Sequence, residues 1–460
     1  MTDVASLFYD DNVEKSTLHR RITPNSEQFE EQQERWNTLA DYLVDDLKER
    51  SGYAISTWLQ GSYKLGTQVR GARKGDEFDI DLGVYYRWSG DAQDDDFGPK
   101  YLKELVQRSL NSFSSDDVLE VVTPPKMRCC RVRFEGDFHI DVPTYHLNPD
   151  QDTRELATQA DEWEASDPKA MYLWFKEKFA ERERAKVRRQ IRYLKIWAAL
   201  KFEEVESRPS STLLTVLVAE ACDSLDLSRG DDEILADILT ELARRLADDR
   251  EVPNPTDKTE DLSARLQDSD YDAFISATED FQALAEKALA IDDAVSASCA
   301  WSEAFEHFFP MPEPEPVLET KGVNLPVARA TPRITIEAVS RDNRNLHWSG
   351  VNEIGPIPRN CEIRFRIINA DILPPYSEVE WMVRNEGEEA EGTNDLGHRA
   401  GMGLTAVEQS AYKGTHYMDC VVKQHGNIVG IQRALVVVFG AYAPKRNPKR
   451  PGYVKLRGRR

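Results

Sequence analysis

The chain has 460 residues, two-fifths of them hydrophobic, which is enough for two or three domains with buried cores. Its formal net charge of −22 argues against a large surface for duplex DNA, because such surfaces gather Lys and Arg. The sequence holds no apolar run of about 18 residues, and its N-terminus does not resemble a signal peptide. We therefore expect a cytoplasmic protein without a membrane segment.

Helices and strands alternate in the first part of the chain. Apolar residues recur at helical spacing after Asn25 and Ser26, either of which can cap a helix, and Gly52 follows the last of them. Short alternating runs further along predict strands, and Glu135–Asp137 predicts a hairpin turn. The expected elements are a helix at 26–50, a strand at 55–59, a short helix at 63–70, a strand at 78–86, a helix at 99–112, and a hairpin of strands at 127–134 and 138–143.

The pattern changes twice in the later part of the chain. Long amphipathic helices are predicted first, followed by a Pro-rich stretch and then by several short alternating runs that predict a β-sandwich. The fold class is therefore a mixed α+β core with a helical domain and a C-terminal all-β domain. The expected division is an α+β domain at 1–165, a helical domain at 166–312, a linker at 313–330, a β-sandwich at 331–442 and a basic tail at 443–460.

Two aspartates that lie two residues apart carry the sharpest chemical signal. Asp79 and Asp81 point to one face of their strand, because side chains alternate along a strand. Two crowded carboxylates repel each other unless a shared divalent cation offsets their charge. An isolated Asp-x-Asp pair is more often a solvated strand edge, so its meaning depends on what surrounds it.

Asp141 supplies a third carboxylate in the second strand of the hairpin. If that strand lies beside the strand of Asp79, the three acids converge and can hold two Mg2+ or Mn2+ ions, which activate a hydroxyl and stabilise a leaving pyrophosphate. Asp141 could also accept the proton of that hydroxyl. His139 shares the strand face of Asp141, and we expect it to have a structural or supporting role.

The turn Gly61–Ser62 precedes the acidic strand. Its backbone N–H groups and its hydroxyl suit a triphosphate, especially where a helix begins. Such a turn is ordinary when it stands alone, but its place ahead of three acids favours phosphate binding.

These residues lie in segments that resemble a known family. GSYKLGT (61–67), DEFDIDLGV (76–84) and FHIDVP (138–143) together resemble the DNA polymerase β-type nucleotidyltransferase superfamily. More narrowly, about residues 50–310 are similar to the cGAS/DncV-like nucleotidyltransferases of bacterial anti-phage defence. The resemblance implies a metal-dependent enzyme that makes cyclic or linear oligonucleotide signals from nucleoside triphosphates for a downstream effector.

The resemblance also implies roles for single residues. The family's metal ligands match Asp79, Asp81 and Asp141. Its remaining nucleotide-binding positions match Gln60, Gly61, Ser62, Lys195, and either Ser210 or Ser211, between which the sequence does not decide. The segment VEWMVRNEGEEA (379–390) resembles the C-terminal sensor-type domain of some of these enzymes, which implies ligand sensing or partner contact.

Lys195 also stands in a basic helical stripe. Arg184, Arg188 and Arg192 share its face at helical spacing. Such a stripe is usually a solvated face, but opposite a triphosphate it becomes an electrostatic clamp.

The cysteines and the tail point to no second chemistry. The six cysteines include no C-x-x-C pair, which disfavours a zinc site, and the adjacent Cys129 and Cys130 predict strand packing. The tail at 443–460 holds eight basic and no acidic side chains, so the rest of the chain carries −30. The tail is either a solvated end or a binding segment for an acidic or nucleic-acid partner, and Tyr453 within it could accept nucleotides in a protein-primed reaction.

We therefore expect template-independent synthesis of a short oligonucleotide. The alternatives are a linear or protein-primed oligonucleotide polymerase, a transferase that extends RNA ends, and an inactive sensor or scaffold. The sequence leaves open the bases, the linkage, the activating signal and the oligomeric state.

Overall fold

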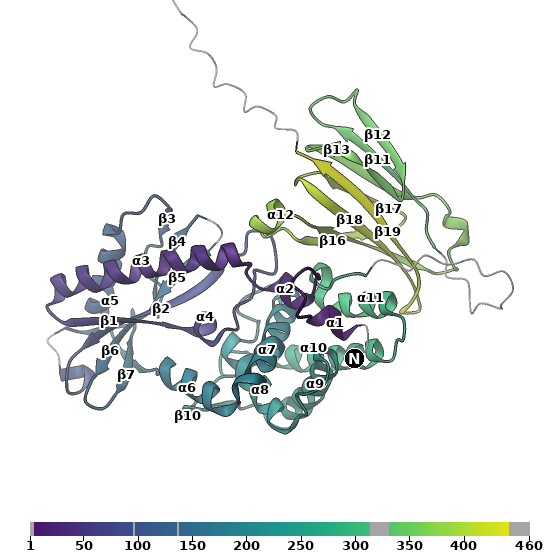
Figure 1. Ribbon diagram of the computed structural model, residues 1–460. Coiled ribbons are helices and arrows are strands. Elements are labelled where there is room, and N and C mark those ends of the chain that lie inside the picture. Colours follow the sequence, from purple (N-terminus) through teal and green to yellow (C-terminus); the bar gives the residue numbers. More distant parts are fainter. Residues whose placement is uncertain (1–3, 95–96, 136–137, 313–330, 441–460) are drawn as a thin grey trace, which may run out of the picture. The chain divides into compact units, whose positions relative to one another are not determined.

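The computed structural model describes residues 4–94, 97–135, 138–312 and 331–440, which fall into two compact units. The first unit takes the chain up to Lys321 together with Gly392–Leu396, and the second takes the remainder. The first unit mixes helices with a sheet, whereas the second is built almost entirely of strands (Figure 1). The expected fold class is thereby confirmed.

An eight-stranded sheet organises the N-terminal half of the first unit. Its strands follow the order β3-β4-β5-β2-β6-β7-β8, and β1 pairs with β2 as well. β5 and β6 run parallel to successive parts of β2, so one strand of the sheet touches three neighbours. The strands are β1 (Ala54–Gln60), β2 (Phe78–Arg87), β3 (Val118–Val121), β4 (Cys130–Phe134), β5 (Phe138–Val142), β6 (Thr144–Asn148), β7 (Thr153–Ala157) and β8 (Trp163–Ala165).

Two helices cover one face of this sheet and leave the other face for chemistry. α3 (Ser26–Ser51) and α5 (Pro99–Ser112) share a core with β2, β4 and β5. Asn25 caps α3 in a capping box with Gln28, and Gly52 ends the helix in the left-handed conformation. The core residues of the two helices are Leu39, Ala40, Leu43, Leu47, Leu102, Leu105, Val106 and Leu110.

The helical part of the first unit has a core of its own. It contains α6 (Pro168–Lys178), α7 (Glu181–Lys201), α8 (Ser211–Ala221), α9 (Asp231–Asp248), α10 (Asp268–Leu289) and α11 (Ala294–Phe305), with a small hairpin of β9 (Pro253–Asn254) and β10 (Asp257–Asp261). The short helices α1 (Ala5–Phe8) and α2 (Leu18–Ile22) also pack here, through Phe8 and Ile22. The expected division had instead grouped α1 and α2 with the sheet, in a domain at 1–165. No helix among the described residues is both long and apolar enough to cross a membrane.

The second unit is the expected β-sandwich. A four-stranded sheet of order β12-β11-β14-β17 and a five-stranded sheet of order β13-β19-β18-β15-β16 share one core, in which Trp381 is fully buried. The strands are β11 (Ile334–Ser340), β12 (His347–Val351), β13 (Glu353–Pro358), β14 (Cys361–Ile367), β15 (Glu378–Asn385), β16 (Gly397–Met402), β17 (Thr405–Gln409), β18 (Gly414–Gln424) and β19 (Asn427–Phe439), with the short helix α12 (Glu388–Gly392). The basic tail with Tyr453 lies outside the described residues.

None of the six cysteines, all of which lie among the described residues, forms a disulfide, and all but Cys129 are buried. Cys130 lies in the core of the sheet, as predicted, whereas Cys129 precedes β4 and is only half-buried.

The segment Gly392–Leu396 is part of the first unit, although α12 and β16 on either side of it build the second. Leu396 is buried in the helical core. Asn394 donates hydrogen bonds from Nδ2 to the carbonyl oxygens of Gly71 and Arg73, each at 3.2 Å. A Cβ atom on Gly71 would lie 2.2 Å from Asp76 Cβ and 2.9 Å from Asn394 Nδ2, so glycine permits both close approaches. The segment therefore holds the loop that leads into β2.

Candidate active site

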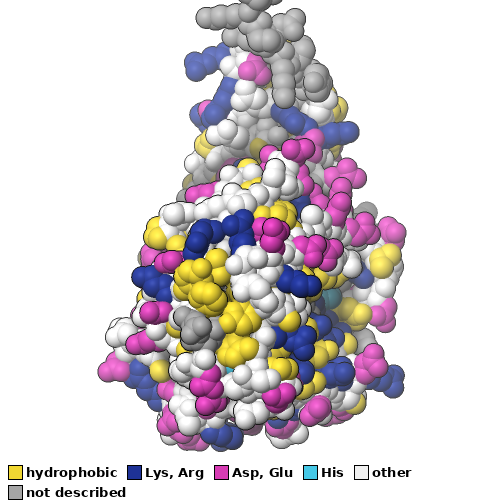
Figure 2. Space-filling model, turned by 90° about the vertical axis from the view of Figure 1, so that its left-hand side faces the viewer, with side chains coloured by type: hydrophobic (Ala, Val, Ile, Leu, Met, Phe, Trp, Pro, Cys, Tyr) yellow, Lys and Arg dark blue, Asp and Glu magenta, His cyan; other side chains and the backbone are white. Residues whose placement is uncertain are grey.

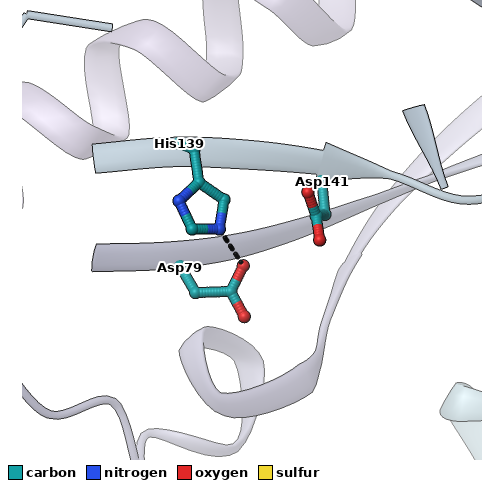
Figure 3. Close-up of side chains that lie close together, drawn as sticks. All are labelled: Asp79, His139 and Asp141. Carbon is teal, nitrogen blue, oxygen red and sulfur yellow. Dashed lines mark ion pairs between the residues drawn. The ribbon is translucent and has the colours of Figure 1, made fainter. Parts of the chain in front are cut away.

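Pairing between β2 and β5 brings the three aspartates together. The two strands are parallel, with Asp79 opposite His139 and Asp81 opposite Asp141. Residues in register on neighbouring strands point to the same face, so all four side chains lie on the face away from α3 and α5. Figure 3 shows Asp79 on β2 directed toward His139 and Asp141 on β5. Ligand atoms of Asp79, His139 and Asp141 lie within 4.8 Å of one another.

The chain turns sharply beside Asp81. Gly61 has a φ of +60°, and a Cβ atom there would lie 1.9 Å from Asp81 Oδ2. Glycine is therefore required for two reasons, the backbone conformation and the close approach of a carboxylate. The turn puts the start of a helix directly against the acidic cluster.

That helix, α4 (Gly61–Leu65), begins earlier and ends earlier than the predicted helix at 63–70. Gly66 stops it by adopting the left-handed conformation, with a φ of +67°. The N-cap position makes no side-chain hydrogen bond, because the Gln60 amide is engaged elsewhere, donating to Tyr145 and accepting from Tyr85. The first N–H groups of α4, which include that of Ser62, thus have no side-chain cap and suit an anion.

The charges of the three aspartates are mutually unfavourable. Burial raises the pKa of Asp81 well above its ordinary value, and the neighbouring charges of Asp79 and Asp141 raise it further, while Lys195 opposes the shift. A divalent cation between the carboxylates would remove this repulsion. The donor set therefore fits the Mg2+ or Mn2+ ions implied by the sequence.

Two cations that sequence reasoning missed hold Asp141. Arg131 on β4 binds both carboxylate oxygens, with Nε 2.5 Å from Oδ1 and Nη2 2.8 Å from Oδ2, and Lys126 Nζ lies 3.7 Å from Oδ2. Burial opposes ionisation of Asp141, but the hydrogen bonds and charge of Arg131 lower its pKa. The alternation of β4, in which Cys130 and Val132 face the core, was the signal that Arg131 faces the acids.

The basic stripe on α7 holds the backbone that follows α4. Arg188 donates to the carbonyl oxygen of Leu65, Arg192 to that of Gln68, and Lys195 to that of Thr67. Arg184 instead donates to Phe179 and does not join them. Lys195 is buried and Arg188 and Arg192 are half-buried, so these three members bind backbone carbonyl oxygens rather than forming a solvated face.

Lys195 is the member of the stripe whose pKa responds to the charges of Asp79 and Asp81. Burial lowers its pKa to about 8, Arg192 contributes to the shift, and Asp79 and Asp81 oppose it. Lys195 is therefore a buried ammonium that feels the charges of two carboxylates while it donates to the Thr67 carbonyl oxygen.

The predicted serine after α7 stays undecided. Ser210 accepts a hydrogen bond from the backbone N–H of Leu213 and so caps α8, while Ser211 is the exposed first residue of that helix. No contact in the described part of the chain joins either hydroxyl to the Gly61 turn, so the assignment of both remains a prediction.

Comparison with known proteins agrees with this arrangement. Residues 55–145 match the family described as cyclic GMP-AMP synthase DncV-like, nucleotidyltransferase domain, and residues 303–439 match the adenylyl/guanylyl and SMODS C-terminal sensor domain. The chain is 27% identical to a cyclic GMP-AMP synthase of Escherichia albertii over 447 residues, which cover 96% of this chain and 98% of the relative. It is 26% identical to a c-di-GMP synthase of Roseivirga ehrenbergii, over 54% of this chain and 73% of the relative.

Solved structures share the fold. The DncV cyclic AMP-GMP synthase of Vibrio cholerae, in complex with the linear intermediate 5'-pppA(3',5')pG, superposes with a TM-score of 0.57 at 20% identity, over 67% of this chain and 96% of that one. The 3'-deoxy GTP-bound DncV of Escherichia coli superposes with a TM-score of 0.55 at 19% identity, over 65% of this chain and 95% of that one. The resemblance to cGAS/DncV-like nucleotidyltransferases, with a sensor-type domain after them, is thereby confirmed.

Proposed function

We propose that this DncV-like nucleotidyltransferase joins nucleoside triphosphates into a short oligonucleotide signal, releasing pyrophosphate and using no template. The observation that carries the proposal is the parallel register of β2 and β5, which gathers Asp79, Asp81 and Asp141 beside the Gly61 turn. Two relatives that match along much of this chain are named for cyclic dinucleotides, which favours a cyclic product with two nucleotides.

In this proposal the three aspartates hold divalent ions. When bound, such ions supply charge stabilisation for the attacking hydroxyl and for the leaving pyrophosphate. Asp79 and Asp81 come from one strand and Asp141 from its neighbour, so the metal-binding oxygens are fixed by a sheet rather than by a loop. Because Arg131 lowers the pKa of Asp141, this carboxylate is a better holder of charge than acceptor of a proton.

The chain's own donors bind the triphosphate. The N–H groups at the start of α4, including those of Gly61 and Ser62, face the anion, and Lys195 supplies a buried positive charge. The reaction then needs only that the hydroxyl of a second nucleotide reach the α-phosphorus of the first.

Template-independence and biological role belong to the same proposal. The chain carries −22, and Figure 2 shows Lys and Arg interspersed with Asp and Glu on the face that it draws, rather than gathered into one stripe. We place the reaction in the cytoplasm, as a step of anti-phage signalling whose product binds a separate effector.

The test is product identification. The full chain is incubated with each ribo- and deoxyribonucleoside triphosphate, alone and in pairs, with Mg2+ or Mn2+, and the products are analysed by mass spectrometry before and after phosphatase. We expect pyrophosphate and a phosphatase-resistant cyclic dinucleotide. The variant carrying Asp79→Asn and Asp81→Asn should form neither, whereas Glu135→Gln, an exposed acid at the hairpin, should behave as wild type. Elongation of an RNA that is added to a parallel sample, or an equally active double variant, would overturn the proposal.

A further inference from the structure

His139 occupies an unusual place for a histidine with a purely structural role. It is 93% buried, with an exposed fraction of 7%, and it lies on the acidic face of β5 directly opposite Asp79. Its Nδ1 is 2.8 Å from Glu77 Oε2, and Glu77 is itself held by Arg133, whose Nε lies 2.6 Å from Oε1. The ring is therefore held at Nδ1 by Glu77, which is itself paired with Arg133.

The other nitrogen of the ring points into the acidic cluster. His139 Nε2 lies 3.0 Å from Asp79 Oδ1, which is the ion-pair contact marked by the dashed line in Figure 3, but the geometry is not that of a hydrogen bond. Within the described residues Nε2 has no hydrogen-bond partner. In the tautomer that donates its Nδ1 proton to Glu77, the lone pair of Nε2 faces a carboxylate oxygen.

Two electron-rich atoms that face each other at this distance are suited to a shared cation. Ligands that meet at a right angle on a six-coordinate ion, each about 2.1 Å from it, lie about 3.0 Å apart. The separation of Nε2 and Asp79 Oδ1 is 3.0 Å. Metal-bound histidines usually donate their second N–H to a carboxylate, which is the relation between His139 and Glu77.

We propose that His139 is a nitrogen ligand of the divalent ion held by Asp79, and that Glu77 positions its ring. The inference rests on the proposed function only in placing a divalent ion at this cluster. The site is then a mixed nitrogen–oxygen site, and imidazole nitrogen favours transition metals over Mg2+.

The decisive measurement is pulsed electron paramagnetic resonance of Mn2+ bound to the full chain. Electron-spin-echo modulation detects nitrogen nuclei that are coordinated to Mn2+. One sample is prepared with natural histidine and a second with 15N-labelled histidine. The natural sample should show 14N modulation, and labelling should replace it by 15N modulation.

Three variants assign the signal. His139→Gln should abolish the nitrogen modulation and weaken Mn2+ binding by at least about tenfold, and Glu77→Gln should weaken binding by about tenfold or more while the modulation persists or shifts. His146→Gln is the matched control, because His146 is also buried, lies in the same sheet, and faces Glu155 at 3.9 Å. It should retain both the modulation and the affinity.

Bound Mn2+ without histidine modulation, or no Mn2+ binding at all, would overturn the proposal. An absence of Mn2+ binding counts only if a cooperative thermal unfolding transition shows that the sample is folded. Product formation measured on the same samples separates this inference from the proposed function. Dinucleotide made without nitrogen modulation would exclude His139 as a ligand but leave the proposed enzyme activity intact. Nitrogen modulation without any product would support His139 as a ligand and contradict the proposed activity.

Discussion

Replacing Asp81 by Asn should stabilise the metal-free protein while it abolishes nucleotidyl transfer. Asp81 carries a charge that its surroundings oppose, because burial and the charges of Asp79 and Asp141 all raise its pKa. Asparagine has nearly the same shape and carries no charge. The substitution therefore removes an electrostatic cost that the folded protein carries at the proposed metal site.

The size of the effect follows from the spacing of the strands. Asp79 is two residues away along β2, about 6.7 Å, and Asp141 is one strand away, about 4.8 Å. At an effective dielectric constant of about 20, each repulsion is worth about 2.5–3.5 kcal/mol. Lys195 and Arg131 offset much of this sum. We expect Asp81→Asn to gain about 1–3 kcal/mol at neutral pH.

The assay is denaturant unfolding of the wild type and the variant in a chelator, across a range of pH. A raised pKa in the folded state means that stability is fully present below the ordinary pKa of the carboxyl and is lost as pH rises through the folded value. The wild type should therefore lose stability as pH rises from about 4, and the variant should not. At acid pH, where Asp81 is protonated, the two should converge.

Added metal should make the wild type more stable than the Asp81→Asn variant. Ions at 100 times their dissociation constant stabilise the wild type by about 2.7 kcal/mol, and the variant should gain much less. If the variant is no more stable than the wild type in chelator, or if the difference does not shrink at acid pH, the repulsion between the three carboxylates is not what we infer.

Three further predictions concern other residues of the chain. The kcat/KM for triphosphate should fall above about pH 8, where free Lys195 loses its proton, and Lys195→Ala should have a low and flat profile in steady-state assays. Gly61→Ala should lose activity and about 1–2 kcal/mol in chemical unfolding, because its Cβ meets a carboxylate, whereas Gly52→Ala, which has a similar positive φ in open space, should lose stability only. Leu396→Ala should destabilise the first unit by about 2–5 kcal/mol in thermal unfolding, while the half-exposed Leu404→Ala should change stability by about 0.5 kcal/mol or less.

Local patterns were enough to predict most of the elements that carry the site. Strict alternation around Asp79 and Asp81 predicted β2, and Asn25 and Gly52 predicted both ends of α3. These signals are local, because they depend on side chains that face alternate sides of a strand or on caps within one helical turn.

Contacts between distant segments were beyond such patterns. The parallel register of β2 and β5 was a condition of the sequence argument and not its result, since pairing depends on the whole sheet. Gln60 was predicted to bind nucleotide, but its side chain is held by two buried tyrosines, so only its position at the turn supports that role. The contact of Asn394 with Gly71 joins residues more than 300 apart, and no composition signal marks it.

The ligand geometry of His139 was likewise hidden. The sequence places it two residues before Asp141 on one strand face, which is compatible with a core role. Only the Glu77 contact on one side and the Asp79 contact on the other give its two ring nitrogens different surroundings.

The most direct test of the central claim is pyrophosphate release, measured at one concentration of protein, triphosphate and Mn2+ for the wild type and for the variant carrying Asp79→Asn with Asp81→Asn. We predict one pyrophosphate for each bond formed by the wild type, none in excess chelator, and a rate at least about 10³-fold lower in the variant, since each 1.36 kcal/mol of lost stabilisation costs a factor of ten. A folded double variant that releases pyrophosphate at the wild-type rate would contradict the claim that these carboxylates hold the catalytic ions.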